Sequence, residues 1–255
     1  MSSASPVAVD DSPFDLAPSD GQGNGAGALC LHGLTGTPYE VRPLAEALVA
    51  QGIRARGIRM AGHDGGVEEL ARSSRVEWVD RARAELRSLR AEHDRVFLIG
   101  VSMGGLVSLR LAQTESVDGL VVVGVPLVLA PPIPQLLPLL RLMMSARKKR
   151  GSDIRDPDAR ARHPGHPAMP LDSVNELIGL QAEVLPNLGK VEAPILVAHG
   201  ELDTTARPRD AKRLHDEVGS RAKELMMLPH SGHVATVDYD GLELAAAATR
   251  FLAQY

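Results

Sequence analysis

Short apolar segments alternate along the chain with longer segments that are apolar on one side only. Residues 27–31, 96–99, 120–125 and 195–198 are nearly continuous apolar runs, which are typical of strands buried on both faces of a parallel sheet. Residues 76–92 instead place apolar side chains along one stripe at helical spacing. Strands and helices in this alternating order predict an α/β fold, with a mostly parallel central sheet and helices on both of its faces.

Turn and capping signals locate the other elements of this alternation. Thr37 and Pro38 provide an N-cap and a proline at the first helical position, and the helix that they begin ends at Gly52. The remaining expected strands cover residues 53–59 and 224–228, and the remaining expected helices cover residues 103–113, 209–218 and 241–254. With these elements, the alternation extends from the first expected strand to the end of the chain, apart from one interruption.

The interruption lies between residues 126 and 189, where the chain is first rich in Pro and Leu, then basic, then rich in Pro and His. Neither flanking half has enough strands to form a sheet of its own. We therefore expect one α/β core, made of residues 26–125 and 190–255, with residues 126–189 inserted into it as a small lid. Residues 1–25 are rich in Ser, Asp, Pro and Gly, and we expect them to form a flexible N-terminal tail.

The composition excludes several classes of protein. The 255 residues carry a formal net charge of -4, which gives no general attraction for nucleic acid or for an anionic membrane. The single cysteine, Cys30, excludes a disulfide framework and a zinc finger or ribbon, and we expect it to be a small buried residue. The hydrophobic fraction of 44% is ordinary for a globular protein, and nothing in the sequence indicates a metal or another cofactor.

Targeting signals are also missing from the sequence. Residues 1–40 contain no Lys or Arg, so the basic segment of a secretory signal is absent, and so is its apolar segment. The longest uncharged stretch, residues 119–140, is interrupted by five prolines, which remove backbone donors that lipid could not replace. We expect a cytoplasmic protein that is a monomer or a homodimer.

Residues 100–104 read Gly-Val-Ser-Met-Gly and fit the pattern G-x-S-x-G. An expected strand precedes this motif and an expected helix follows it, which is the context in which the pattern forms a nucleophile elbow. The flanking glycines relieve the crowding of a tight turn, so that the hydroxyl of Ser102 projects from the carboxyl edge of the sheet. We therefore predict that Ser102 is a catalytic nucleophile rather than only a helix cap.

A serine nucleophile needs a base, and the base needs a carboxylate to orient it. In this type of elbow the acid and then the histidine follow the serine, each just past a strand end. His230 and His233 both follow the last expected strand, and we favour His233 because Gly232 gives the loop freedom to aim the ring. The other seven histidines precede Ser102, lie in the lid or in a helix, or precede any suitable acid: His32, His63, His93, His163, His166, His199 and His215.

The acid and the oxyanion hole follow from the same order of elements. Asp203 comes just past a strand and is the predicted acid, whereas we expect the competing Glu201 to be a solvated loop charge. An oxyanion hole needs two backbone N–H groups that point at the developing negative charge. We expect one from Met103, directly after the nucleophile, and the other from Leu34 in the Gly-rich loop 32–36.

Together these features resemble the α/β-hydrolase superfamily, and within it the small carboxylesterase and monoacylglycerol lipase group. The matching segments are residues 32–36 (His-Gly-Leu-Thr-Gly), 62–64 (Gly-His-Asp), 100–104, Asp203 with Pro208 after it, and 231–234 (Ser-Gly-His-Val). They extend over about residues 27–255 in the family's order and at its approximate spacing, and they leave the N-terminal tail outside the match.

The resemblance implies an α/β-hydrolase fold with a small lid between the strands that end near Val125 and begin near Pro194. It also implies Ser102 as nucleophile, His233 as base and Asp203 as its partner. The amides of Leu34 and Met103 would form the oxyanion hole. The family often has Phe where this sequence has Leu34, so the wall of the acyl pocket differs here.

The first part of the expected lid is strongly apolar. Its Leu and Met side chains suit contact with a flexible acyl chain, although a dimer contact or ordinary core packing is the alternative. The residues that we expect to contact substrate are Leu127, Leu136, Leu140, Met143 and Met144. No aromatic residue lies between Phe97 and Tyr239, which predicts that this part of the pocket wall is aliphatic and thioether.

The rest of the lid carries charged and ring side chains. Residues 147–150 are basic, and we expect a solvated helix end rather than contact with a lipid surface. His163 and His166 lie among prolines without nearby cysteines or paired carboxylates, so we expect a flexible lid loop rather than a metal site.

The predicted function is hydrolysis of carboxylic esters, either with short- to medium-chain acyl groups or as monoacylglycerols, through an acyl-enzyme. The expected partner is a small apolar ester and not nucleic acid. A thioesterase or acyltransferase could use the same triad, and a non-catalytic small-molecule binder is the alternative outside enzymes.

Overall fold

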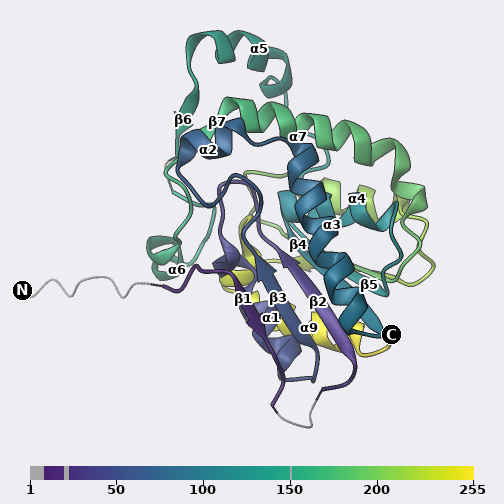
Figure 1. The fold of residues 1–255 in the computed structure, drawn as a ribbon. Coiled ribbons are helices and arrows are strands. Elements are labelled where there is room, and N and C mark those ends of the chain that lie inside the picture. Colours follow the sequence, from purple (N-terminus) through teal and green to yellow (C-terminus); the bar gives the residue numbers. More distant parts are fainter. Residues whose placement is uncertain (1–8, 20–22, 150) are drawn as a thin grey trace, which may run out of the picture.

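A seven-stranded sheet forms the centre of the part of the chain that the structure describes, residues 9–19, 23–149 and 151–255 of a computed structural model (Figure 1). Neighbouring strands are parallel except at one edge, where β1 runs antiparallel to β3. In spatial order the strands are β1 (Phe14–Leu16), β3 (Arg54–Ile58), β2 (Ala26–Leu31), β4 (Arg95–Val101), β5 (Gly119–Val123), β8 (Ile195–Gly200) and β9 (Lys223–Leu228). The predicted mostly parallel sheet is confirmed.

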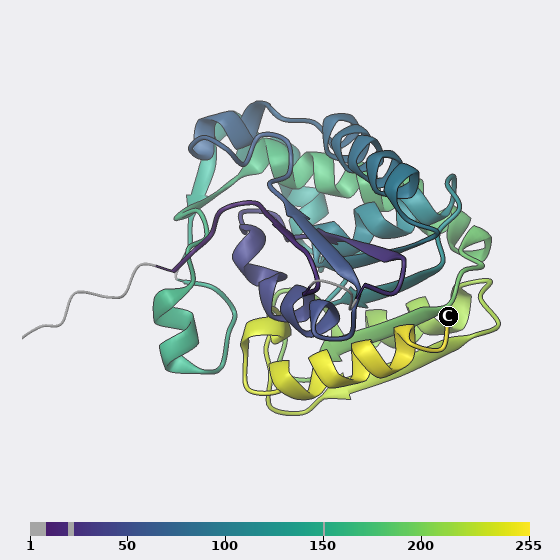
Figure 2. The same ribbon diagram turned by 60° about the horizontal axis from the view of Figure 1, so that its bottom comes forward.

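Helices cover both faces of this sheet. On one face α1 (Arg42–Val49) lies beside α9 (Gly241–Leu252), as Figure 2 shows. The opposite face carries α3 (Arg75–Glu92), α4 (Met103–Ala112) and α8 (Pro208–Glu217). Two short 3₁₀ helices, η1 (Pro38–Glu40) and η3 (Ala235–Val237), belong to the loops that follow β2 and β9.

The strand side chains alternate between two hydrophobic cores, one on each face. In β4, Leu98 packs with the α3 and α4 side of the sheet, whereas the next residue, Ile99, packs with the α1 and α9 side. Ile99 lies opposite Val121 of β5, which faces the same core. Because neither face is open to water in the middle of the sheet, residues 96–101 of β4 and all of β5 are apolar and buried, and the alternation typical of a half-exposed strand is missing.

The start of α3 is set by its cap. Ser74 and Glu77 form a capping box, in which the Ser74 hydroxyl accepts the Glu77 N–H and the Glu77 carboxylate accepts the Ser74 N–H. One turn on, Trp78 is fully buried and its Nε1–H donates to the Ser73 hydroxyl at 2.9 Å. The apolar stripe predicted the body of this helix, and the cap sets its first residue at Arg75.

The inserted segment, residues 126–189, contains two kinds of structure. Helix α7 is part of the core, because Leu177, Leu180 and Val184 are buried against the α3 and α4 side of the sheet. Helix α5 projects beyond α7, away from the sheet (Figure 1). The elements of this region are α5 (Ile133–Met143), β6 (Ala146–Lys148), α6 (Pro157–Arg162), β7 (Ala168–Pro170), α7 (Leu171–Val184) and η2 (Leu185–Lys190), and α2 (Val67–Arg72) packs against α7 and β7.

The prediction that residues 1–25 form a flexible tail is wrong for residues 14–16, which form the edge strand β1. Phe14 is buried over Gly57 of β3, where a Cβ would lie 2.2 Å from the Phe14 ring. Asp15 is paired with Arg54 at 2.7 Å and with Arg56 at 3.0 Å. Residues 1–8 and 20–22 lie outside the described part of the chain.

Helix α5 also bears on the membrane question, since it is apolar and exposed. It has 11 residues, about half of what a bilayer-spanning helix needs. Among the residues that the structure describes, no helix combines the length and the apolar character needed to cross a membrane.

Candidate active site

Ser102 lies at the junction between β4 and α4. Its backbone has φ 54° and ψ -116°, in the left-handed half of conformational space that a residue with a Cβ rarely adopts. The neighbouring glycines explain how this turn is held. A Cβ on Gly100 would lie 2.4 Å from the Gly104 carbonyl oxygen, and a Cβ on Gly104 would lie 2.1 Å from the Leu31 oxygen. The turn therefore packs directly against the end of β2, and only glycine fits at both positions.

Three side chains from the ends of three strands meet at this turn. His233, after β9, places Nε2 2.9 Å from the Ser102 hydroxyl and Nδ1 2.7 Å from Oδ2 of Asp203, which follows β8. All three residues are 8–9% exposed, so the hydrogen-bonded chain is shielded and retains contact with solvent at its edge. The structure thus brings together the three residues that the sequence singled out.

The charges of these three hydrogen-bonded side chains make the His233 imidazole more basic. Burial alone would raise the pKa of Asp203, but the ring of His233 and the hydrogen bonds to the carboxylate hold that pKa well below its ordinary value. Burial alone would lower the pKa of His233, and the Asp203 carboxylate raises it above its ordinary value of 6.5. An ionised acid beside a more basic imidazole is the arrangement that removes a proton from a serine hydroxyl.

Further contacts orient the acid. Its Oδ1 accepts the N–H of Thr205 at 2.7 Å and the N–H of Ala206 at 2.8 Å. The buried ring of His199 places Nε2 2.9 Å from Oδ2 of Asp203, although it lacks the alignment of a hydrogen bond. His199 is not an expected base because it precedes the acid in the sequence, and the structure places it against that acid. The spacing His-Gly-Glu-Leu-Asp was the available signal.

The loop that carries His233 is packed differently from our expectation. Gly232 was expected to provide conformational freedom, but its φ is not among the positive values. A Cβ at Gly232 would lie 2.7 Å from the Asp153 carbonyl oxygen, so glycine is needed for close approach. The same carbonyl accepts the Val234 N–H at 3.3 Å, and Oδ2 of Asp153 accepts the Thr204 N–H at 2.7 Å. Asp153 therefore joins the acid loop to the histidine loop.

Two further carboxylates, which the sequence did not indicate, accept hydrogen bonds from the loop that carries His233. Asp238 accepts the N–H of Gly232 at 2.8 Å and the N–H of Arg155 at 2.8 Å, and so ties the loop to the inserted segment. Asp240 accepts the Ser231 hydroxyl at 2.7 Å and pairs with Nδ1 of His230 at 2.9 Å. The side chain of His230 is 72% exposed, in keeping with the expectation that it is a surface residue.

Residues 32–36, the loop that we expect to supply one oxyanion donor and call the oxyanion loop, lie next to Ser102. A Cβ on Gly33 would lie 3.2 Å from Cβ of Ser102. Met103 begins α4, where the first N–H groups have no helical acceptor. Within the described part of the chain, the Leu34 N–H has no hydrogen-bond acceptor either. Thr35, with φ 63°, is the second non-glycine residue in the left-handed region.

Buried charged and ring residues surround this loop, and sequence reasoning assigned no role to them. His32 and His63 are buried with ring centroids 4.9 Å apart, and burial lowers their pKa values from 6.5 to about 4 and about 3. Glu40 lies under the loop, and its Oε1 is 3.0 Å from Nε2 of His163 in the insertion. The flexible lid loop expected around His163 is therefore a fixed contact. The described residues contain no group of His, Cys, Asp and Glu side chains that could hold a metal ion.

The five expected substrate contacts occupy different environments. Leu127 is fully buried in the core that also holds Met103. Leu140 is half-buried, whereas Met143 is 75% exposed and Leu136 and Met144 are 45% and 47% exposed. The basic cluster is also divided, because Lys149 turns inward and donates to the Thr35 hydroxyl at 2.9 Å. Arg150 lies outside the described residues.

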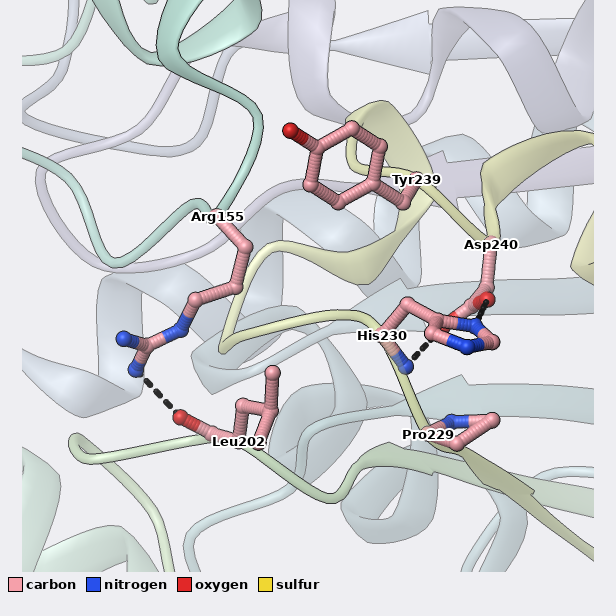
Figure 3. A pocket seen from close by; sticks show the side chains of 6 residues that line it. All are labelled: Arg155, Leu202, Pro229, His230, Tyr239 and Asp240. Carbon is pink, nitrogen blue, oxygen red and sulfur yellow. Dashed lines mark hydrogen bonds and ion pairs between the residues drawn. The ribbon is translucent and has the colours of Figure 1, made fainter.

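An open groove of about 470 Å³ lies beside the acid and histidine loops (Figure 3). It is lined by Arg155, Leu202, Pro229, His230, Tyr239 and Asp240. The guanidinium of Arg155 is directed at the Leu202 carbonyl, and the ring of His230 at Asp240. Each of these polar groups therefore already has a partner within the lining of the groove.

The sequence and the fold of this chain are similar to those of known proteins. The family model described as Serine aminopeptidase, S33 (Hydrolase_4) matches residues 26–240. A thermostable monoacylglycerol lipase from Bacillus sp. (strain H-257) is 30% identical over 237 residues, which are 90% of this chain and 91% of that protein. A carboxylesterase from Bacillus subtilis (strain 168) is 25% identical over 218 residues, 85% and 88% of the two chains. A solved structure of the metagenome-derived lipolytic enzymes LipS and LipT superposes with a TM-score of 0.89 at 27% identity, and covers 98% of this chain and 100% of that one.

Proposed function

Because this chain belongs to the α/β-hydrolase family described as Serine aminopeptidase, S33, we propose that it hydrolyses carboxylic esters through a Ser102–His233–Asp203 triad. The observation that carries the proposal is the hydrogen-bonded chain from the Ser102 hydroxyl through both ring nitrogens of His233 to Asp203, at 2.9 and 2.7 Å. The relatives named monoacylglycerol lipase and carboxylesterase support an ester as the substrate.

The first half of the reaction forms an acyl-enzyme. The Ser102 oxygen attacks the ester carbonyl while Nε2 of His233 accepts its proton, and Asp203 stabilises the imidazolium that results. The N–H groups of Leu34 and Met103 stabilise the oxyanion of the tetrahedral intermediate. When this intermediate collapses, His233 donates its proton to the oxygen of the leaving alcohol.

The second half returns the enzyme to its starting state. Water enters the position that the alcohol has left, and His233 removes a proton from it as it attacks the acyl carbon. Collapse of the second tetrahedral intermediate releases the carboxylic acid and returns the proton to Ser102. No cofactor takes part in these steps, since the triad supplies both the nucleophile and the proton transfer.

The substrate proposed is a short- to medium-chain acyl ester or a monoacylglycerol. The apolar insertion, including the half-buried Leu140, would contact the acyl chain, and its aliphatic and thioether residues suit a flexible chain. A series of p-nitrophenyl esters and monoacylglycerols of increasing chain length measures this preference as kcat/KM. Parallel assays on thioesters and on amino acid p-nitroanilides distinguish an esterase from a thioesterase or an aminopeptidase.

The test of the nucleophile is Ser102→Ala. We expect kcat on p-nitrophenyl butyrate to fall by about 10⁴-fold or more, and labelling by a fluorophosphonate to disappear. The matched control is Ser173→Ala, which removes a buried serine whose hydroxyl donates to the Leu70 carbonyl at 2.9 Å. Turnover retained by a folded Ser102→Ala variant would refute the proposal, and an unlabelled, inactive wild-type protein would favour a binding protein.

A further inference from the structure

Glu40 is a buried carboxylate that the triad does not use. It ends η1, seven residues after Gly33, and is 4% exposed. A buried carboxylate is costly unless hydrogen bonds and opposite charge compensate the loss of water. Burial alone would raise its pKa, but the His163 ring and the Gly33 N–H lower the pKa of Glu40 to about 2. The group is therefore an anion at neutral pH, in the interior beside the oxyanion loop.

The oxyanion loop wraps around this anion. Oε2 of Glu40 accepts the N–H of Gly33 at 2.8 Å. A Cβ on Gly33 would lie 3.2 Å from Oε2, and a Cβ on Gly36 would lie 2.3 Å from Oε1. Gly36 therefore approaches the carboxylate more closely than any other residue could, and a Cβ at Gly33 would be in tight contact with it. The loop is closed on itself as well, because the Gly36 N–H donates to the Gly33 carbonyl at 3.0 Å.

The second oxygen of Glu40 connects this loop to the inserted segment. Oε1 lies 3.0 Å from Nε2 of His163, and Nδ1 of His163 lies 2.8 Å from the Ser152 hydroxyl. The side chains of His163 and Glu40 are 2% and 5% exposed. Residues 123 positions apart in the sequence thus form one buried pair under the oxyanion loop.

The insertion holds the same loop from a second side, at Thr35. The Lys149 ammonium donates to the Thr35 hydroxyl at 2.9 Å, and the backbone N–H of His166 donates to the Thr35 carbonyl at 2.8 Å. Thr35 is 1% exposed and keeps the left-handed backbone with φ 63°. Leu34 therefore lies between Gly33, bound by Glu40, and Thr35, bound by the insertion. Both neighbours of its N–H are fixed.

We propose that Glu40 is a positioning residue, which holds the Leu34 amide in place for the oxyanion and links that amide to the inserted segment through His163. The inference rests on the proposed function, in which the Leu34 N–H stabilises the tetrahedral intermediate. Glu40 does not touch the reacting atoms in this account. It acts through the Gly33 peptide, so its loss affects the transition state more than substrate binding.

The test compares Glu40→Gln with Glu46→Gln, an exposed glutamate on the neighbouring helix α1. Glutamine keeps the shape of the side chain but removes the charge that pairs with His163. We expect kcat on p-nitrophenyl butyrate to fall by about 10- to 100-fold in Glu40→Gln, with KM within about threefold of wild type. Glu46→Gln should have wild-type kcat and KM. A Glu40→Gln variant that folds and keeps wild-type kcat overturns the inference.

His163→Gln is the second variant, and it decides the matter if Glu40→Gln does not fold. It leaves the bond between Glu40 and Gly33 in place, so we expect a smaller loss of kcat, about 3- to 10-fold, again with little change in KM. If both single variants fold, the variant that carries both substitutions should lose less kcat than the product of the two single losses, because both substitutions break the same link. A wild-type kcat in His163→Gln overturns the coupling to the insertion.

The two proposals fail in different ways. If Ser102→Ala keeps wild-type turnover, the proposed function is wrong whatever the Glu40 variants do. If Ser102→Ala is inactive while folded Glu40→Gln and His163→Gln variants turn over like wild type, the triad stands and only this inference is wrong. A fall in melting temperature without a fall in kcat shows that the pair is merely structural.

Discussion

The nine histidines of this chain show how far surroundings change one residue type. His233 and His32 are both at least nine-tenths buried. The Asp203 carboxylate raises the pKa of His233 against the effect of burial, whereas burial lowers the pKa of His32 to about 4. In the neutral ring of His32, Nε2 accepts the Met60 N–H at 3.1 Å. The proposed catalytic base and a neutral structural ring thus differ by what faces each ring nitrogen.

Asp203→Asn tests this account of the base. His233 must be neutral to accept the Ser102 proton, so its raised pKa places the acidic limb of kcat/KM above pH 6.5 in wild type. Asparagine keeps the shape but removes the charge. We expect kcat to fall by about 10³- to 10⁴-fold and the limb to move to lower pH. The measurement is kcat/KM between about pH 5 and 9. The control is Asp216→Asn, an exposed pair with Lys212 on α8, and an unmoved limb would contradict the assignment.

At the scale of elements, the insertion is the least uniform part of the molecule. Helix α7 belongs to the core and is tied to α3, where Arg75 pairs with Glu176 at 2.9 Å and with Glu183 at 2.7 Å. The loop between β6 and β7 holds the triad and oxyanion loops. Helix α5 exposes several large apolar side chains, including Leu142 at 85%. One inserted segment therefore combines core packing, support of the site and an open apolar helix.

Two leucine substitutions separate these roles. Leu180→Ala in α7 removes a side chain that is fully buried, and we expect it to lower the free energy of unfolding by about 2–5 kcal/mol. Leu142→Ala in α5 removes one that is 85% exposed and should change the same quantity by less than about 0.5 kcal/mol. Urea unfolding at neutral pH measures both. Equal losses would mean that α5 is packed against something in solution.

The order of elements was predictable, because it depends on local periodicity. The strands β2, β3, β4, β5, β8 and β9 and the helices α3, α4 and α9 fall within a few residues of their predicted bounds. Strand β1 was missed because it has only three residues, and its identity as a strand depends on pairing with β3. Within the insertion, composition could not separate α5 from α7. Both are Leu-rich, and only their packing partners differ.

At the scale of the whole molecule, the polar residues in the core make stability depend on pH. His32 and His63 have folded pKa values of about 4 and about 3, below the ordinary value of 6.5. Between the folded pKa values of these two rings and the ordinary value of 6.5, the unfolded chain binds protons that the folded chain does not. The free energy of unfolding therefore falls as pH decreases below 6.5. The raised pKa of His233 acts in the opposite direction only above 6.5, where its contribution is lost as pH rises.

We expect urea denaturation to show this loss between about pH 6.5 and 4, with a slope of up to about 1.4 kcal/mol per pH unit for each proton taken up. Proton uptake on unfolding, measured at about pH 5, should approach two protons from these two rings. Stability that is flat or rises as the pH is lowered through this range would contradict the assignment of neutral buried rings.

The sequence by itself determined the α/β architecture and singled out the three residues of the proposed triad. Both follow from local patterns: apolar runs form strands, and the carboxyl ends of parallel strands gather Ser102, Asp203 and His233 at one edge. Only the tertiary structure decided how these residues are held. Glu40 with His163, and Asp153 between the acid and histidine loops, are contacts between distant segments. Such contacts depend on how the insertion packs onto the core, and no periodicity along the chain records that packing.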